Sequence, residues 1–322
     1  MRSRSLCAGV SAVLVAMSGC AAGTDGDNVE DLKAAYFHNF ELRWEVERAV
    51  DRVARVCMEQ LGYHVHPEEV PAPEQSAEEL VMRTFVWTSP DPGTVHVDGY
   101  GDRLGGNITT TYVDGEVVVT DSSEYERLPE SERLAYQADL HGPDMEAEHA
   151  QLSDGTEVGW IVGGCVGAAN RVLFADGVFD FLEQRTHATG GADNGWLDDH
   201  RVRDVHRQWS VCMAERGYPD FDVPQDAVSA LSVRRPDSDT LDGAEYDARL
   251  EEFADITVDQ AVADLACHER YEVQPTQEAV FWEYMLDYLA DYEVTVFGFA
   301  DAADSILETA QQIIEAGELP VH

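Results

Sequence analysis

The chain contains one internal repeat, which constrains the fold more than any other feature of the sequence. When Cys57 is placed over Cys212, eight of the sixteen positions from Arg48 to Tyr63 are identical in the two copies. The shared pattern is Arg-x-Val-x-Arg-x-x-x-Val-Cys-Met-x-x-x-Gly-Tyr, and it ends at Tyr218 in the second copy. Because there are only two copies, the sequence predicts a duplicated module and not a solenoid.

Both copies have the periodicity of an amphipathic helix. Apolar residues recur every three or four positions, at Val46, Val50, Val53, Cys57 and Leu61 in the first copy and at Val202, Val205, Trp209, Cys212 and Met213 in the second. Gly62 and Gly217 follow the last turn, where a left-handed residue commonly caps a helix. We therefore expect each cysteine on a buried stripe near a helix end, within reach of a second helix.

The beginning of the chain has the organisation of a bacterial lipoprotein leader. Two arginines precede an apolar stretch from Leu6 to Met17, and Met17-Ser18-Gly19-Cys20 resembles a lipobox. This stretch is shorter than the ~20 apolar residues that a membrane-spanning helix needs. We predict a signal peptide over residues 1–19 and a diacylglycerol on Cys20. Met17 stands where such signals usually have an aliphatic residue, and the alternative is an ordinary signal peptide cut elsewhere.

The predicted mature chain begins with a short tether and continues into a body large enough for one or two domains. Residues 20–28 are small and polar, as in a flexible linker. Apolar residues make up 44% of the sequence, which is enough for a packed core. We place the first helical module, with a loop and hairpin insertion, at 29–190 and the second at 191–322.

Four cysteines remain after Cys7, in the predicted leader, and Cys20 are set aside: Cys57, Cys165, Cys212 and Cys267. An even number of cysteines in an exported chain indicates disulfides. A duplicated module should carry its own bridge, so we expect Cys57 to pair with Cys165 and Cys212 with Cys267. The competing arrangement joins the two early cysteines and the two late ones, which would tie the modules together.

The fold class expected from these features is mainly α, with a small hairpin in the first module and a long C-terminal helix. Asp114-Gly115 is a typical two-residue hairpin turn between strands expected at 108–113 and 116–120. Ser76 and Glu79 have capping-box spacing. We expect 225–252 to be a long polar loop with a short helix. Residues 276–316 are expected to form one very long helix, or two that break near Gly298.

The second copy of the repeat resembles a motif of uncharacterised actinobacterial lipoproteins and secreted proteins. Its residues are Cys212-Met213-Ala214-Glu215-Arg216-Gly217-Tyr218-Pro219. The first module is similar to these proteins at Gly99-Tyr100-Gly101, at Gly163-Gly164-Cys165 and at Leu128–Tyr136, where Leu-Pro-Glu-Ser-Glu-Arg replaces their Leu-Ser-Pro-x-Glu-Arg. The resemblance implies a shared scaffold, a downstream paired cysteine and an extracytoplasmic location. It implies no particular activity.

The charge is strongly negative and limits the partners. There are 63 acidic and 21 basic residues, a net charge of −42. Such a field argues against nucleic acid and bare anionic lipid as partners, and a solvated acidic surface is the simplest interpretation. The partners that we expect are the membrane, through the N-terminal lipid, and an envelope protein or wall component.

No motif identifies a catalytic residue, and we expect no cofactor. The sequence lacks HExxH, GxSxG, a P-loop and a strand-linked GxGxxG. His64 and His66 would share one face of a strand, but they lack an evident third metal ligand. His200 and His206 are six residues apart on a helix and do not share a face well. We predict a non-catalytic binding or envelope-associated lipoprotein. The alternative is a wall-polymer hydrolase with a carboxylate pair in a polar cleft.

Overall fold

The computed structural model describes residues 26–87, 89–101, 111–113, 116–118, 123–175, 177–191, 194–236 and 243–320. The fold is mainly helical, as the sequence predicts. The helices are α1 Gly26–Gln60, α2 Ala77–Phe85, α3 Val95–Asp98, α4 Glu130–His141, α5 Gly164–Phe174, α6 Val178–Thr189, the 3-10 helix η2 Asn194–Asp198, α7 His200–Glu215, α8 Pro224–Arg234, α9 Gly243–Tyr271, α10 Val273–Asp291 and α11 Glu293–Ala316. This part of the chain also has antiparallel hairpins, β1 Thr111–Val113 with β2 Glu116–Val118 and β3 Ala147–Gln151 with β4 Glu157–Ile161.

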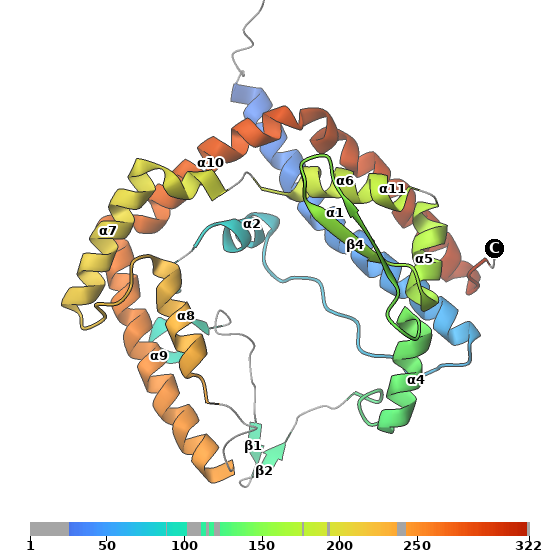
Figure 1. Ribbon diagram of the computed structural model, residues 1–322, viewed down its shortest axis with the longest axis horizontal. Helices are drawn as coiled ribbons and strands as arrows, with labels where there is room; N and C mark the ends of the chain where they lie inside the picture. The colour runs from blue at the N-terminus through green and yellow to red at the C-terminus, as the bar shows by residue number, and fades with distance from the viewer. Residues whose placement is uncertain are drawn as a thin grey trace, which may run out of the picture.

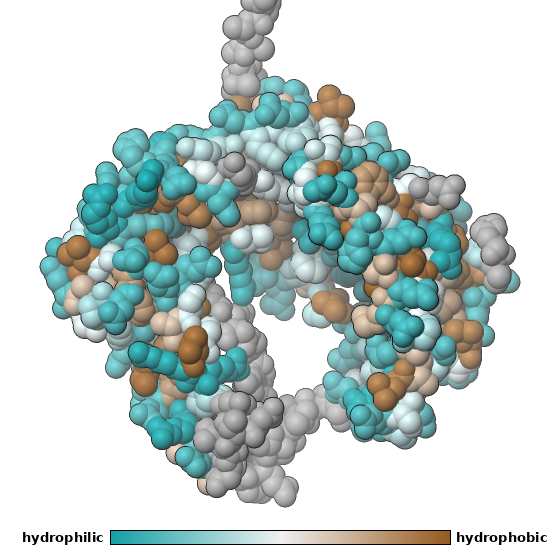
Figure 2. Space-filling model, viewed as in Figure 1, coloured by the Kyte–Doolittle hydropathy of each residue, from teal (hydrophilic) through white to brown (hydrophobic). Residues whose placement is uncertain are grey.

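The helices form an open arch (Figure 1). One limb contains α7, α8 and α9, and the other contains α4, α5, α6 and the β3–β4 hairpin. The helices α1, α10 and α11 join the limbs, and α2 lies on the concave side between them. The face seen in Figure 2 is mostly hydrophilic, with a hollow between the limbs. No helix in the described part of the chain is both long enough and apolar enough to cross a bilayer.

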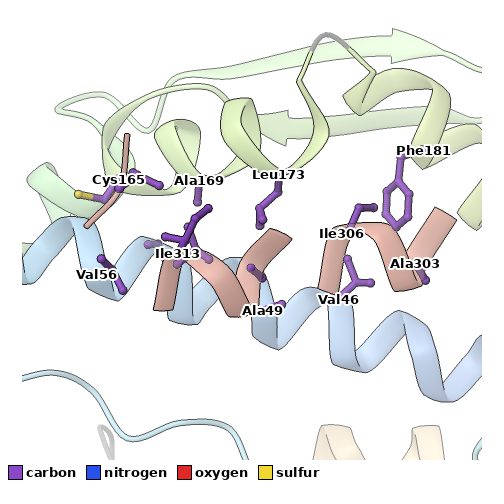
Figure 3. Close-up of a cluster of buried hydrophobic side chains, with 14 of the residues drawn as sticks. Val46, Ala49, Val56, Cys165, Ala169, Leu173, Phe181, Ala303, Ile306 and Ile313 are labelled. Atoms are coloured by element: carbon purple, nitrogen blue, oxygen red, sulfur yellow. The ribbon is translucent and has the colours of Figure 1, made fainter. Parts of the chain in front are cut away.

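The first core cluster joins the two ends of the chain. Helix α11 packs along α1, and α5 and α6 cover both. Small side chains at Ala49, Ala169 and Ala303 are buried at these contacts and let the helices approach closely (Figure 3). The C-terminal helix of the predicted second module therefore completes the core of the first.

The other two clusters lie at the top of the arch and in the opposite limb. At the top, Tyr36 of α1 packs with Phe281 and Met285 of α10. In the limb, Trp209 and Met213 of α7 pack with α9 residues and with Tyr100, which follows α3. Packing thus crosses the predicted boundary between residues 190 and 191 in both directions.

Both copies of the repeat end in the same backbone cap. The Tyr63 N–H donates to the Met58 carbonyl at 3.1 Å, and the Tyr218 N–H donates to the Met213 carbonyl at 2.9 Å. In each copy the intervening glycine has positive φ, +95° at Gly62 and +98° at Gly217. These are the bonds of a Schellman motif, and the predicted left-handed caps are confirmed.

The structure confirms both predicted disulfides. Cys57 on α1 is bonded to Cys165 on α5 with a Cα separation of 5.6 Å, and Cys212 on α7 to Cys267 on α9 with a separation of 5.8 Å. Gly164, beside Cys165, has no Cβ because one would lie 2.5 Å from the Leu140 carbonyl oxygen.

The partner helix of each bridge runs against the direction of the repeated helix. Helix α5 runs antiparallel to α1, since Cys165 lies above Val56 and Leu173 above Ala49 (Figure 3). Helix α9 also runs against the direction of α7, since α7 descends its limb from the top of the arch and α9 rises toward α10 (Figure 1). The two bridged partners therefore have the same direction relative to the repeated helices. The two copies of the repeat are equivalent in the helix, in the cap that ends it and in the disulfide that it carries.

Several local expectations are confirmed and others need correction. The predicted hairpin strands are present as β1 and β2, while the predicted turn residues Asp114 and Gly115 lie outside the described residues. The Ser76–Glu79 capping box starts α2. The segment 225–252 is largely helical and not a long loop, because Pro224 begins α8 and Asp226 accepts hydrogen bonds from the backbone before it. The β3–β4 hairpin was not predicted, because its strands are mostly exposed and lack the alternation that marks a half-buried strand.

The ends of the long helices also differ from expectation. Helix α1 begins at Gly26, within the predicted tether, whereas the signal peptide and Cys20 lie outside the described residues. The C-terminal helix breaks at Tyr292, and Gly298 lies inside α11. The ring of Tyr292 stacks on His187, with 4.1 Å between ring centroids. Leu61 is 58% exposed and does not continue the buried stripe of α1.

Candidate functional site

The larger of two pockets on the repeated helices opens beside α7 and is referred to below as the α7 pocket. Its volume is about 730 Å³, which lies within the range of small-molecule sites. Five segments line it: α2 with the residues after it (Arg83, Thr84, Phe85, Val86, Trp87), η2 (Asn194, Trp196, Leu197, Asp198), α7 (Arg203, His206, Arg207, Ser210), the loop into α8 (Asp222, Val223, Pro224, Gln225) and α10 (Gln277).

The α7 pocket gathers positive charge in a very acidic chain. Three arginines line it, Arg83, Arg203 and Arg207, against two aspartates, Asp198 and Asp222. Both aspartates are exposed. The aromatic rings of Phe85, Trp87 and Trp196 complete the lining. A ligand in this pocket would therefore meet guanidinium groups and apolar rings together.

A buried histidine and a buried amide meet in the wall of the α7 pocket. The Nε2 atoms of His206 and Gln277 are 2.6 Å apart, and the two residues are 8% and 1% exposed. Burial lowers the pKa of His206 to about 4, so the imidazole is neutral at ordinary pH. Gln277 Oε1 has no hydrogen-bond partner within the described part of the chain. The amide nitrogen of Gln277 thus contacts the histidine, and its oxygen makes no hydrogen bond to a described residue.

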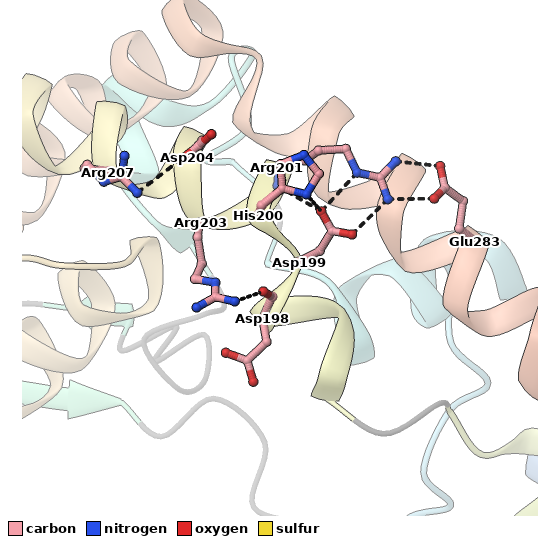
Figure 4. Close-up of polar contacts among 8 residues, drawn as sticks. All are labelled: Asp198, Asp199, His200, Arg201, Arg203, Asp204, Arg207 and Glu283. Carbon is pink, nitrogen blue, oxygen red and sulfur yellow. Dashed lines mark hydrogen bonds and ion pairs between the residues drawn. The ribbon is translucent and has the colours of Figure 1, made fainter.

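The charged residues at the start of α7 point to different sides of the helix (Figure 4). Arg201 bridges Asp199 and Glu283, with distances of 3.0 Å and 2.6 Å from Nη2. Arg203 donates to the backbone carbonyl of Asp198, and Arg207 pairs with Asp204 at 3.1 Å. Arg201 therefore ties α7 to α10, whereas Arg203 and Arg207 belong to the pocket.

The second pocket lies beside α1 and is referred to below as the α1 pocket. Its volume is about 260 Å³. Its lining comes from α1 (Arg48, Asp51, Ala54, Arg55), the segment after the Gly62 cap (Pro67, Glu68, Glu69, Val70), α4 (Tyr136, Leu140, His141) and α5 (Val166). Burial, followed by the nearby Glu47 charge, raises the pKa of Asp51 above its usual range.

The two pockets are built at equivalent positions of the internal repeat. Seven residues of the α1 pocket have a counterpart in the α7 pocket at the spacing that separates Cys57 from Cys212. The pairs are Arg48 with Arg203, Asp51 with His206, Arg55 with Ser210, Pro67 with Asp222, Glu68 with Val223, Glu69 with Pro224 and Val70 with Gln225. The duplication thus extends past the sequence motif into the segment that follows it.

The shared cap explains why both copies make a pocket. Each Schellman motif turns the chain back along the face of the helix that it ends. The Arg55 guanidinium then donates to the Pro67 carbonyl at 2.9 Å, and the equivalent Ser210 hydroxyl donates to the Phe221 carbonyl at 2.6 Å. In both copies the same helix position therefore holds the returning segment, and the space between them is the pocket.

The two copies differ in what faces the second arginine of the motif. In the first copy, Glu69 accepts hydrogen bonds from two nitrogens of Arg52, at 3.2 Å from Nε and 2.9 Å from Nη2. Hydrogen bonding to Arg52 holds the pKa of Glu69 below its usual range. In the second copy, the equivalent arginine is Arg207 and the residue in place of Glu69 is Pro224.

The structure separates the histidines considered from the sequence. His66 is half-buried, 3.0 Å from the Tyr136 hydroxyl, whereas His64 is exposed. The described residues contain no group of three side chains suited to a metal ion. His200 is exposed, and His206 lies in the α7 pocket.

Sequence reasoning did not identify either pocket. The signal available was the repeat itself, because three of its arginines line the pockets: Arg48 lines the α1 pocket, and Arg203 and Arg207 line the α7 pocket. No protein-family model matches the chain, and no curated protein or solved structure is significantly similar to it. The site must therefore be interpreted from its own geometry.

Proposed function

We propose that this chain is a lipid-anchored binding protein of the extracytoplasmic face, which holds a small ligand in the α7 pocket without converting it. The observation that carries the proposal is the α7 pocket itself, with about 730 Å³ of space between α2, η2, α7, α8 and α10. It combines aromatic rings with a few polar groups, which is typical of ligand sites. Two disulfides and the lipoprotein-like leader support the location.

The polar groups of the α7 pocket suit binding better than acid–base chemistry. Among the described residues, His206 contacts an amide and not a carboxylate, so it has no partner there of the kind that usually orients a catalytic imidazole. Asp198 and Asp222 are both exposed, without the burial that raises the pKa of a general acid. The wall-polymer hydrolase is therefore the weaker proposal.

A bulky side chain introduced at the entrance of the α7 pocket tests the binding function. Gln225 is exposed at the pocket rim, so Gln225→Trp should fill the entrance without changing the charge or the core. The full chain is purified from its producing cells, and native mass spectrometry records bound small molecules. We expect a bound species in the wild type, less of it in Gln225→Trp, and no loss in Val233→Trp, which is exposed outside the pocket. Equal occupancy in all three proteins would refute the proposed site.

The anchor is tested separately. Mass spectrometry of the N-terminal peptide from membrane-extracted protein should find a diacylglycerol on Cys20. Cys20→Ser should release the chain from the membrane fraction. An unmodified N-terminus beyond Cys20 would refute the anchor and leave the pocket unaffected.

A further inference from the structure

The geometry points to a carboxylate as the group that the α7 pocket recognises, on a small organic acid with an aromatic or bulky apolar part. This inference rests on the proposed binding function and names its ligand class. In the first copy of the repeat, Glu69 of the chain itself is the carboxylate bound by the motif arginine. In the second copy the same arginine position is retained, and the internal carboxylate is replaced by proline.

The first copy shows how this arginine position binds a carboxylate. Arg52 uses Nε and Nη2 on the two oxygens of Glu69, at 3.2 Å and 2.9 Å. This paired arrangement is the strong, directional form of an arginine–carboxylate contact. Arg55 adds a third nitrogen, 3.7 Å from Glu69 Oε1. The internal carboxylate belongs to the segment that lines the α1 pocket.

The second copy leaves its arginine available to an external acid. Arg207 lines the α7 pocket and pairs with Asp204, three residues earlier on the same helix. The side chains of that pair are 73% and 54% exposed, and such surface pairs contribute little free energy. Exchange of Asp204 for a ligand carboxylate therefore costs little. Arg203 donates to a neutral backbone carbonyl, so its charge is not cancelled by that bond.

The rest of the lining selects the remainder of the ligand. Phe85, Trp87 and Trp196 offer apolar surface to a ring or a branched chain. The free end of the Gln277 amide can bond a polar group such as a secondary amide. The long-range field of a chain with net charge −42 repels anions, so only an acid that also gains the apolar and amide contacts should be held.

The test uses N-acetyl-L-phenylalanine, which carries a carboxylate, a ring and an amide, and its neutral analogue N-acetyl-L-phenylalaninamide. Calorimetric titration of the full-length chain should give a dissociation constant on the order of millimolar for the acid. We expect the neutral analogue to bind about tenfold more weakly or worse, because it loses the charge-assisted pair.

Variants assign the binding to the second copy. Arg207→Met should weaken binding of the acid by about tenfold or more, whereas Arg52→Met, the same change at the equivalent position, should leave it within about twofold. Pro224→Glu restores the internal carboxylate and should also prevent binding. Circular dichroism checks that each variant folds, and Arg207→Met carries the test if Pro224→Glu does not fold.

The outcomes separate this inference from the function on which it rests. Equal binding of acid and neutral analogue, no detectable binding of either, or equal effects of Arg207→Met and Arg52→Met would each overturn the carboxylate assignment. A native ligand that is lost in Gln225→Trp but retained in Arg207→Met would keep the binding function and reject the ligand class. Loss of the native ligand in both variants supports both proposals.

Discussion

The indole N–H of Trp209 donates a 2.7 Å hydrogen bond to Oδ1 of Asp264, a carboxylate that is completely buried. The Tyr100 hydroxyl donates to Oδ2 of the same carboxylate at 3.0 Å, and His268 lies 3.3 Å from Oδ1. A buried charge is costly unless hydrogen bonds satisfy it. This carboxylate therefore fixes α7, α9 and the segment after α3 in one arrangement.

Tyr100→Phe should destabilise the protein although it removes a single oxygen atom. The lost bond leaves Asp264 Oδ2 buried with one donor fewer, which costs about 1.5–3 kcal/mol for a bond to a charged group. Tyr218→Phe is a matched control in the same cluster, because no hydrogen bond of the Tyr218 hydroxyl to a described residue is observed and its side chain is half-buried. Urea unfolding of both variants measures the difference, and equal losses would contradict a special role for the Asp264 contact.

Removal of either disulfide should cost a similar amount of stability. The bridges close loops with sequence separations of 108 and 55 residues, worth about 4–5 kcal/mol each in the chain-entropy model. Because the dependence on loop length is logarithmic, Cys57→Ser with Cys165→Ser should be only slightly worse than Cys212→Ser with Cys267→Ser. Thermal unfolding of the two double variants checks this, and a difference of several kcal/mol would show that native packing, and not loop closure, determines their effect.

The sequence predicted the parts of this fold that depend on local pattern. The cysteine positions, the cap glycines and the paired strands β1 and β2 each follow from spacing or backbone conformation within a few residues, and the structure agrees with them. The packing of α11 on α1 depends on contacts between the two ends of the chain, which no local pattern encodes. The pockets were missed for the same reason. Their arginines were visible in the repeat, but the returning segment that makes each helix face concave was not.

A lower pH should reduce the free energy of unfolding, because His206 resists protonation in the folded protein. Burial lowers its pKa to about 4 in the folded chain, against about 6.5 in an unfolded one. Between these values the unfolded chain binds more protons, so this contribution to stability is complete above about pH 6.5 and is lost as the pH falls toward 4. The loss is up to about 3 kcal/mol.

The comparison with His206→Gln isolates that effect from the titration of the acidic surface. Both proteins carry the same carboxylates, so the difference between their urea midpoints across pH 4–7 reports the histidine. We expect the wild type to lose stability relative to His206→Gln as the pH falls. Parallel curves would show that His206 is not protected from protonation in the folded state.

The two cap glycines should respond alike to alanine, because the repeat gives them the same backbone conformation. Gly62 and Gly217 have φ of +95° and +98°, and an added Cβ would meet no atom within 4 Å at either position. The cost of Gly62→Ala or Gly217→Ala is therefore backbone strain alone, about 1–2 kcal/mol.

Gly298→Ala is the control, since Gly298 lies inside α11, with equally open space and no positive φ. It should stabilise the protein by about 0.5–1 kcal/mol, because alanine is the better helix former. Denaturant unfolding of the three variants tests these signs, and a large difference between Gly62→Ala and Gly217→Ala would show that the two caps are not equivalent.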